Sequence, residues 1–191
     1  MKIKIGFFAI LFGLSLLLSH SLFSLAAVLA ALCHELGHLL AARILGIGFR
    51  EFRVGLYGAG LEPSGELFSY GQEILLCLAG PLTNLTLALL LWKMPHPLFV
   101  SHFIFSSLAL GILNLLPIRG FDGGRTLQAL LLFFFPPRTV RGILNLLSFL
   151  FVFLLWSFSV FCLLRIAATL SLFIFSLSLF FRLFVNVNSS I

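Results

Sequence analysis

The sequence predicts an all-α polytopic membrane protein of about six transmembrane helices, with a small membrane-associated β hairpin or sheet around residues 46–72. Of the 191 residues, 61% are hydrophobic and only 9% are charged, whereas soluble domains carry about 25% charged residues. Apolar runs recur along the chain at the lengths that membrane-spanning helices need. The stretch 46–72 interrupts these runs with glycines, charges and a rough alternation of apolar residues, a pattern that is typical of short strands.

The apolar runs divide at short polar interruptions, and each segment between two interruptions is a predicted span. The predicted spans cover residues 5–18, 22–45, 73–92, 98–116 and, as a pair joined by a tight turn at Arg165, 143–184. Pro81 is expected to kink or break the third span. A further apolar helix over residues 126–135 is too short to cross a bilayer. Residues 1–191 are therefore assigned to a single integral membrane domain.

The basic residues predict a topology and do not suggest a nucleic-acid partner. The net charge is +6, but the 12 Lys and Arg residues are spread along the chain and form no basic block. With six spans and a cytoplasmic N-terminus, only Lys93 and Arg165 fall on the outer side, which matches the excess of basic residues in cytoplasmic loops. We therefore expect an integral protein of a bacterial cytoplasmic membrane with both termini in the cytoplasm.

The most informative stretch is His34-Glu35-Leu36-Gly37-His38, an H-E-x-x-H pattern inside the second predicted span. Residues four apart on a helix lie about 40° apart and one turn above each other. His34 and His38 can therefore hold one metal ion together. Glu35 lies next to a ligand and can reach a water molecule on that metal, where it would act as general base. Zinc is the metal that such a pair usually takes, with a third protein ligand and an open position for water.

Two buried histidines without a metal are the alternative interpretation, because the pattern also arises by chance. The setting of the pattern favours the metal. Between Lys4 and Arg43, the only His, Asp, Glu, Lys or Arg outside the motif itself is His20. Ionisable side chains at membrane depth are energetically costly and are candidates for function by default.

Asp122 is the candidate for the third ligand. It is the only Asp of the chain, and it follows the fourth predicted span at the cytoplasmic depth where the topology places the two histidines. Adjacent glycines allow a close approach of the backbone. Apart from Glu35, the glutamates lie in or beside the stretch 46–72, where a solvated surface is the simpler explanation. An ordinary turn residue, or an N-cap of the 126–135 helix, remains the alternative for Asp122.

Taken together, these motifs resemble the site-2 protease family of intramembrane zinc metalloproteases. Besides the H-E-x-x-H pattern, the resemblance rests on Ala79-Gly80-Pro81-Leu82-Thr83-Asn84 and on Asn114-x-x-Pro117 followed by Phe121-Asp122-Gly123-Gly124. It covers about residues 20–130, the expected catalytic core, and Phe121 departs from the Leu that the family usually has. The resemblance implies that His34, His38 and Asp122 bind one zinc ion per chain and that Glu35 activates the water.

Asn84 and Asn114 match family positions that steady the site or contact the substrate backbone, and the alternative is a polar link between helices. The implied function is hydrolysis of a peptide bond in or near a transmembrane segment of a membrane-associated substrate, with the active site toward the cytoplasm. The span arrangement is similar to the branch that processes a sporulation sigma factor, but the chain ends at Ile191 and is expected to lack that branch's nucleotide-binding CBS module.

Several alternatives stay open at this stage. The stretch 46–72 is either a connecting loop or a sheet whose free edge adds an extended peptide as a further strand. The chain could instead be a membrane metal-binding or transport protein, in which Glu35 would be dispensable, or an inactive protease homologue kept as a binding partner. The sequence leaves the substrate, its regulators and the oligomeric state open.

Overall fold

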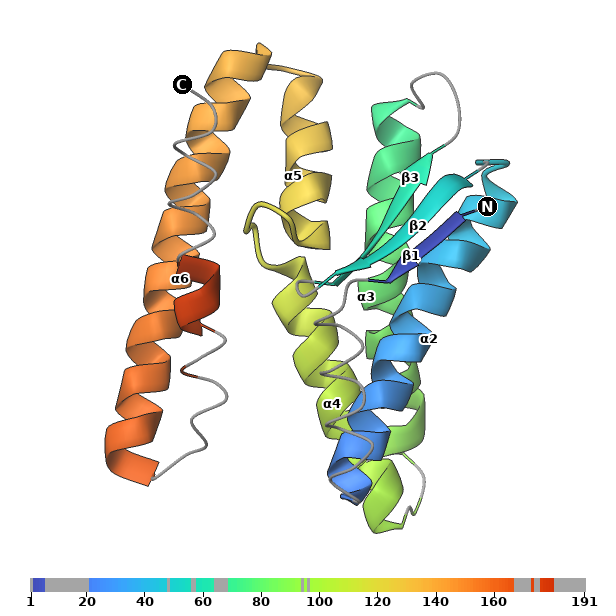
Figure 1. Cartoon of the computed structure of the whole chain (residues 1–191), viewed down its shortest axis with the longest axis vertical. Coiled ribbons are helices and arrows are strands. Elements are labelled where there is room, and N and C mark those ends of the chain that lie inside the picture. Colours follow the sequence, from blue (N-terminus) through green and yellow to red (C-terminus); the bar gives the residue numbers. More distant parts are fainter. Residues whose placement is uncertain are drawn as a thin grey trace. The chain divides into compact units, whose positions relative to one another are not determined.

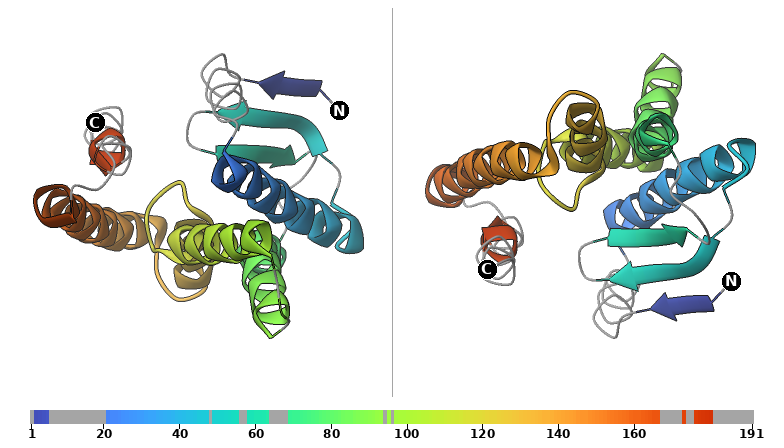
Figure 2. Two further views of the ribbon diagram at one scale, coloured as in Figure 1. Left: turned by 90° about the horizontal axis from the view of Figure 1, so that it is seen from below. Right: turned by 90° about the horizontal axis from the view of Figure 1, so that it is seen from above.

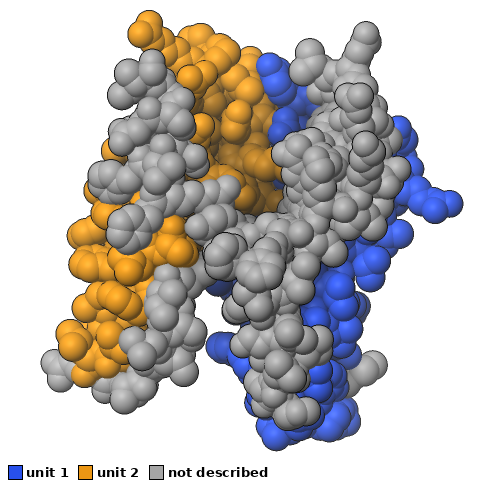
Figure 3. All heavy atoms as spheres, viewed as in Figure 1, with its two compact units in different colours: residues 1–115 blue, residues 116–191 orange. Residues whose placement is uncertain are grey.

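The computed structural model describes residues 2–5, 21–47, 49–55, 58–63, 69–93, 95, 97–166, 173 and 176–180. Along the chain its elements follow the order β1, α2, β2, β3, α3, α4, α5 and α6 (Figure 1). The chain divides into two compact units, residues 1–115 and residues 116–191 (Figure 3). The first unit carries the sheet with α2, α3 and α4, and the second carries α5 and α6.

A three-stranded sheet belongs to the first unit. β1 (Lys2–Ile5) pairs in parallel with β2 (Phe49–Gly55), and β2 pairs antiparallel with β3 (Gly58–Pro63), so β2 is the central strand (Figure 2). β2 and β3 lie within the stretch for which the sequence predicts short strands. β1 is not among the predicted elements. It is only 4 residues long and its partner lies beyond α2, so its pairing leaves no local signal in the sequence.

α2 (Leu22–Ile44) coincides almost residue for residue with the second predicted span. It ends where the chain reaches Gly46, whose φ of +67° lies in the left-handed region. Glycine adopts this conformation without the steric cost that a Cβ would bring, and it commonly ends helices in this way. Arg43 lies in the last turn, where a cation interacts favourably with the helix dipole.

α3 (Tyr70–Trp92) begins before the predicted residue 73 because a capping box forms at its N-terminus. The Ser69 hydroxyl accepts a hydrogen bond from the Gln72 amide, and the Gln72 side chain accepts one from the Ser69 amide. The helix then continues through Pro81. Of the two predicted outcomes, a kink or a break, the break is therefore wrong, and the kink stays a prediction. Membrane helices tolerate proline because neighbouring helices and side chains can satisfy the backbone group that it frees. α4 (Leu98–Leu115) follows the fourth predicted span closely.

Small residues form the contacts among α2, α3 and α4. Ala26, Ala30 and Ala88 are buried completely or almost so. A Cβ built on Gly37 would lie 2.8 Å from the carbonyl oxygen of Ala79, so α2 and α3 approach each other nearly backbone to backbone. Membrane helices associate by close van der Waals packing, which small residues at the interface permit.

Large apolar side chains point away from this bundle. On α2 they recur every three or four residues and are at least 41% exposed, at Leu25, Leu29, Leu32, Leu36 and Leu40. A helix with leucines outside and small or polar residues inside is suited to a lipid surrounding. Within the described residues, four helical segments are long and apolar enough to cross a membrane: Leu22–Ile44, Tyr70–Trp92, Leu98–Leu115 and Pro137–Leu164. The chain is therefore a polytopic membrane protein.

Six spans were expected, and the described part of the chain supports four of them. The first predicted span, residues 5–18, lies outside the described residues except for Ile5. The last predicted span, which follows Arg165, is described only at Ile166, where α6 ends, and at residues 173 and 176–180. These two spans stay predictions.

The second unit begins with an irregular stretch, residues 116–121, which leads into α5 (Asp122–Leu132) and α6 (Pro137–Ile166). Both helices begin earlier than the predicted residues 126 and 143. Asp122 is thus the first residue of α5 and not its N-cap, because Phe121 takes the extended cap conformation. Pro137 opens α6, at the position where a missing N–H costs nothing. Ile118 and Phe121 pack with Val152 and Leu179 to form the core of this unit.

Candidate metal centre

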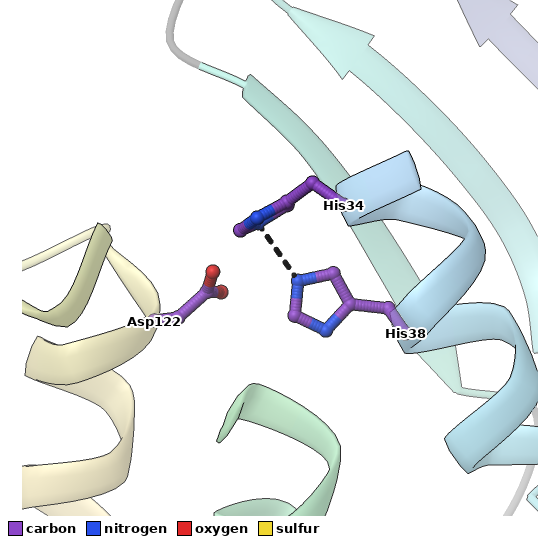
Figure 4. A group of neighbouring side chains, drawn as sticks. All are labelled: His34, His38 and Asp122. Atoms are coloured by element: carbon purple, nitrogen blue, oxygen red, sulfur yellow. Dashed lines mark hydrogen bonds between the residues drawn. The ribbon is translucent and has the colours of Figure 1, made fainter. Parts of the chain in front are cut away.

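His34 and His38 lie on the inner side of α2 and face each other across one helical turn. They are 5% and 8% exposed, respectively. Their Nε2 atoms are 3.2 Å apart, and the two rings meet nearly edge to face (Figure 4). The spacing of four residues predicted this juxtaposition, and the structure confirms it. Because the side chains of a helix at i and i+4 share one face, the helix alone places these two side chains next to each other.

The orientation of the His38 ring is fixed from the neighbouring helix. Its Nδ1 lies 2.8 Å from the carbonyl oxygen of Leu76 on α3. A carbonyl oxygen only accepts hydrogen bonds, so Nδ1 carries the proton and donates it. In the neutral ring, Nε2 is then the atom with a free lone pair. A second partner that fixes the tautomer in this way accompanies almost every metal-bound histidine.

The pair fits a zinc ion. Zinc binds His nitrogens at about 2.0–2.1 Å in a tetrahedral arrangement, so two such nitrogens lie roughly 3.3 Å apart. The observed separation of 3.2 Å between the two Nε2 atoms matches this spacing. Without an ion, the His34 Nε2–H would donate to the His38 Nε2. The donor chemistry, the spacing and the fixed tautomer therefore agree with two neutral imidazole ligands.

Glu35 follows directly in the sequence and is half-buried on the same helix. A residue adjacent to a ligand is rotated by about 100° around the helix axis, so Glu35 belongs to the flank of the His pair and not to its face. This placement suits a carboxylate that acts on a ligand of the metal without being a ligand itself.

Asp122, the first residue of α5, belongs to the second unit and is half-buried. The stretch before it is held by α6. The backbone N–H of Arg119 donates to the Ser148 hydroxyl at 2.9 Å, and an Arg119 guanidinium N–H donates to Asn145 Oδ1 at 2.6 Å. Gly120 has a φ of +94°, which only glycine adopts readily. The carboxylate therefore stands on a short helix whose entry is fixed by side chains of α6.

The two asparagines singled out in the sequence differ in their surroundings. Asn84 on α3 is 0% exposed, and neither atom of its amide has a hydrogen-bond partner among the described residues. An unsatisfied buried amide is costly, which makes Asn84 a candidate for binding a group outside the described residues. Asn114 is half-buried, and its Nδ2 donates to the Leu110 carbonyl of its own helix at 3.1 Å.

Other histidines add nothing to this centre in the part of the chain that is described. The His102 and Phe23 rings meet nearly at right angles, with centroids 5.6 Å apart, and His20 and His96 lie outside the described residues. Sequence analysis missed three supporting groups: the Leu76 carbonyl, Asn145 and Ser148. A backbone carbonyl has no sequence signature. Asn145 and Ser148 are spaced three apart on α6, which is the only signal that could have marked them as one polar face.

Comparisons with known proteins found similarity in part of the sequence and in the fold. No family model matches the sequence. A segment of the chain is 35% identical over 112 residues to a Mycobacterium tuberculosis protein named "Putative zinc metalloprotease Rip2", and the match covers 53% of this chain and 42% of that protein. The chain thus matches less than half the length of that relative. The fold is similar to that of the site-2 protease from Methanocaldococcus jannaschii, with a TM-score of 0.65, 22% sequence identity and coverage of 96% of this chain and 90% of the other.

The fold and the buried His pair define a polytopic membrane protein with a candidate metal site inside its helices. The chain has a fold similar to that of a site-2 protease, and a segment of its sequence is similar to a protein named as a putative zinc metalloprotease.

Proposed function

We propose that the protein is an intramembrane zinc metalloendopeptidase that cleaves a peptide bond in or near a transmembrane segment of a membrane-associated substrate. The observation that carries the proposal is the His34–His38 pair, with its Nε2 atoms 3.2 Å apart and its tautomer fixed by the Leu76 carbonyl. The sequence similarity to a protein named as a zinc metalloprotease supports it.

Asp122 is the proposed third ligand. Together with the two histidines it would complete a set of three side chains, each of which can offer one atom to a metal ion (Figure 4). Two neutral imidazoles and one carboxylate leave a net positive charge on a bound zinc, which suits a developing oxyanion. When bound, zinc would act as a Lewis acid and lower the pKa of a water molecule toward about 7.

The remaining chemistry belongs to residues of this chain. Glu35 takes a proton from the attacking water and passes it to the leaving amine, as a general base and then a general acid. Asn84, buried and without a hydrogen-bond partner among the described residues, is proposed to steady the site or to bind the substrate backbone. Asn114 is proposed for the same role, with its Oδ1 as the available group because Nδ2 donates within its own helix.

The substrate is proposed to bind as an extended peptide. A transmembrane helix must unwind before its backbone can be cleaved, because the intrahelical hydrogen bonds shield the carbonyls. Among the described strands, β3 is an edge strand that pairs only with β2, and an unwound segment could add to its open edge. The sporulation sigma-factor branch, which the sequence suggested, stays a prediction about the substrate.

The proposed topology places the site toward the cytoplasm and both termini inside a bacterial membrane. A reporter fused after Phe49 or Arg138 is expected to be cytoplasmic, and one fused after Lys93 is expected to be external. A periplasmic reporter after Arg138 would put Asp122 at the wrong side of the membrane and remove the depth argument for its role as a ligand.

Glu35→Gln tests the proposed mechanism against the metal-transport and inactive-homologue alternatives. Gln is nearly isosteric but cannot accept the proton, and general-base assistance is commonly worth about 10²- to 10⁴-fold in rate. We expect cleavage of a membrane-anchored substrate to fall by this factor while zinc stays at about one per chain. Glu73→Gln, the same chemical change in the first turn of α3, serves as control and should keep both. Cleavage at the parent rate by Glu35→Gln would contradict the mechanism.

A further inference from the structure

A glycine of α3 lies directly against the metal-binding atoms of α2. A Cβ built on Gly80 would collide with His38 Nε2, and it would lie 2.7 Å from His38 Cε1 and 2.8 Å from His34 Nε2. Real Cβ atoms essentially never make contacts below 3.0 Å. Any side chain at this position would therefore occupy the space beside the two nitrogens that face each other.

The rings cannot move aside without losing other contacts. His38 donates through Nδ1 to the Leu76 carbonyl at 2.8 Å, and Leu76 lies four residues before Gly80 on the same helix. α3 therefore fixes the ring at one nitrogen and leaves space for it at the other. Both histidines are buried. A displaced ring would therefore also collide with neighbouring side chains, because a close-packed interior has little free volume.

Other glycines of the same bundle have different surroundings. A Cβ on Gly111 would meet the Leu85 side chain at 3.1 Å and the Pro81 carbonyl oxygen at 3.2 Å, which are packing contacts between α3 and α4. A Cβ on Gly71 would find only the Ser69 hydroxyl, at 3.8 Å. Among the described glycines tested in this way, Gly80 alone would meet the ligand nitrogens. Glycine is also a poor residue for a helix interior compared with alanine, so its presence at position 80 calls for a specific reason.

We infer that Gly80 is a positioning residue of the metal site, and that the missing side chain keeps the space in front of the His34 and His38 Nε2 atoms open for the ion. The inference rests on the proposed zinc site. In Gly80→Ala, the methyl group would compete with the ion for this space or turn the His38 ring away from the Leu76 carbonyl. Either outcome weakens metal binding before it affects any other part of the protein.

The test measures zinc binding and stability on the full chain in detergent, apart from cleavage. Competition with a chelator should show at least a tenfold loss of zinc affinity in Gly80→Ala. Gly71→Ala, a change on the same helix that would make only an ordinary van der Waals contact, should bind zinc like the parent. Gly111→Ala should lose thermal stability through packing and keep its zinc affinity. Parent-like affinity in Gly80→Ala would overturn the inference.

A double-mutant cycle keeps the inference testable if Gly80→Ala folds poorly. In a His38→Ala background the nearest obstacle is absent, so the loss of thermal stability caused by Gly80→Ala in the metal-free protein should shrink by more than half. An unchanged loss would place the clash elsewhere and overturn the inference.

The proposed function can fail independently of this inference. A parent chain that holds zinc without cleaving any membrane substrate would contradict the proposed protease activity, but it would not contradict the positioning role of Gly80. A parent that binds no zinc would overturn both.

Discussion

The His pair and Asp122 are positioned by different kinds of structure. His34 and His38 lie in the middle of a regular helix, and their mutual spacing follows from helix geometry alone. Asp122 opens a short helix after an irregular stretch, whose course depends on Arg119 and on its contacts with Asn145 and Ser148. A ligand pair on one helix is thus encoded locally, whereas the proposed third ligand depends on residues far along the chain. The two should respond differently to substitution.

The largest expected effect is the loss of a ligand from the pair. His38→Ala and His34→Ala each remove an Nε2 atom, and even residues that only orient a ligand are worth about 10- to 100-fold in metal affinity. We therefore expect zinc affinity to fall by more than roughly 100-fold in each variant, measured as zinc per purified chain after dialysis against a chelator. Asp122→Ala should lose most of its zinc in the same assay. Full zinc retention by Asp122→Ala would move the third ligand elsewhere, most simply to a glutamate of residues 46–72.

A smaller effect is expected from the support of Asp122. Asn145→Leu keeps the branched shape of the side chain but removes the oxygen that accepts from Arg119, and a hydrogen bond to a charged group contributes about 1.5–3 kcal/mol. We expect the free energy of unfolding to fall by about that amount and zinc affinity to fall up to roughly tenfold. Asn145→Asp retains an acceptor and should restore both. Equal losses in the two variants would show that the contact is not what supports the stretch before Asp122.

The smallest expected effect lies at the N-terminus of α3. Ser69→Ala removes one half of the capping box, which typically costs about 0.5–2 kcal/mol of stability. Zinc content should be unchanged, because α3 contacts the His pair farther along, at Leu76 and Gly80. Ser69→Asp, which keeps a side-chain acceptor, should recover most of the lost stability in a thermal unfolding measurement. A loss of zinc in Ser69→Ala would mean that the site depends on the helix end and not only on its interior.

Much of the first unit could be anticipated from the sequence because its information is local. The bounds of α2 and α4 follow from apolar runs that end at glycine, proline or polar residues. Predictions of element ends failed where side-chain and backbone capping decided them, as at the Ser69 capping box and at Phe121 before Asp122. β1 was missed because its only described partner, β2, lies far along the chain.

By itself, the sequence determined that this is a membrane protein and that His34 and His38 share one face of a helix, since composition and a spacing of four residues suffice for both. Only the tertiary structure decided which nitrogen of His38 is available and why position 80 is a glycine. Both depend on the approach of α3 to α2, where the Leu76 carbonyl receives one ring nitrogen and Gly80 leaves room for the other. Contacts of this kind join backbone atoms of one helix to side chains of another, so no pattern within either helix can reveal them.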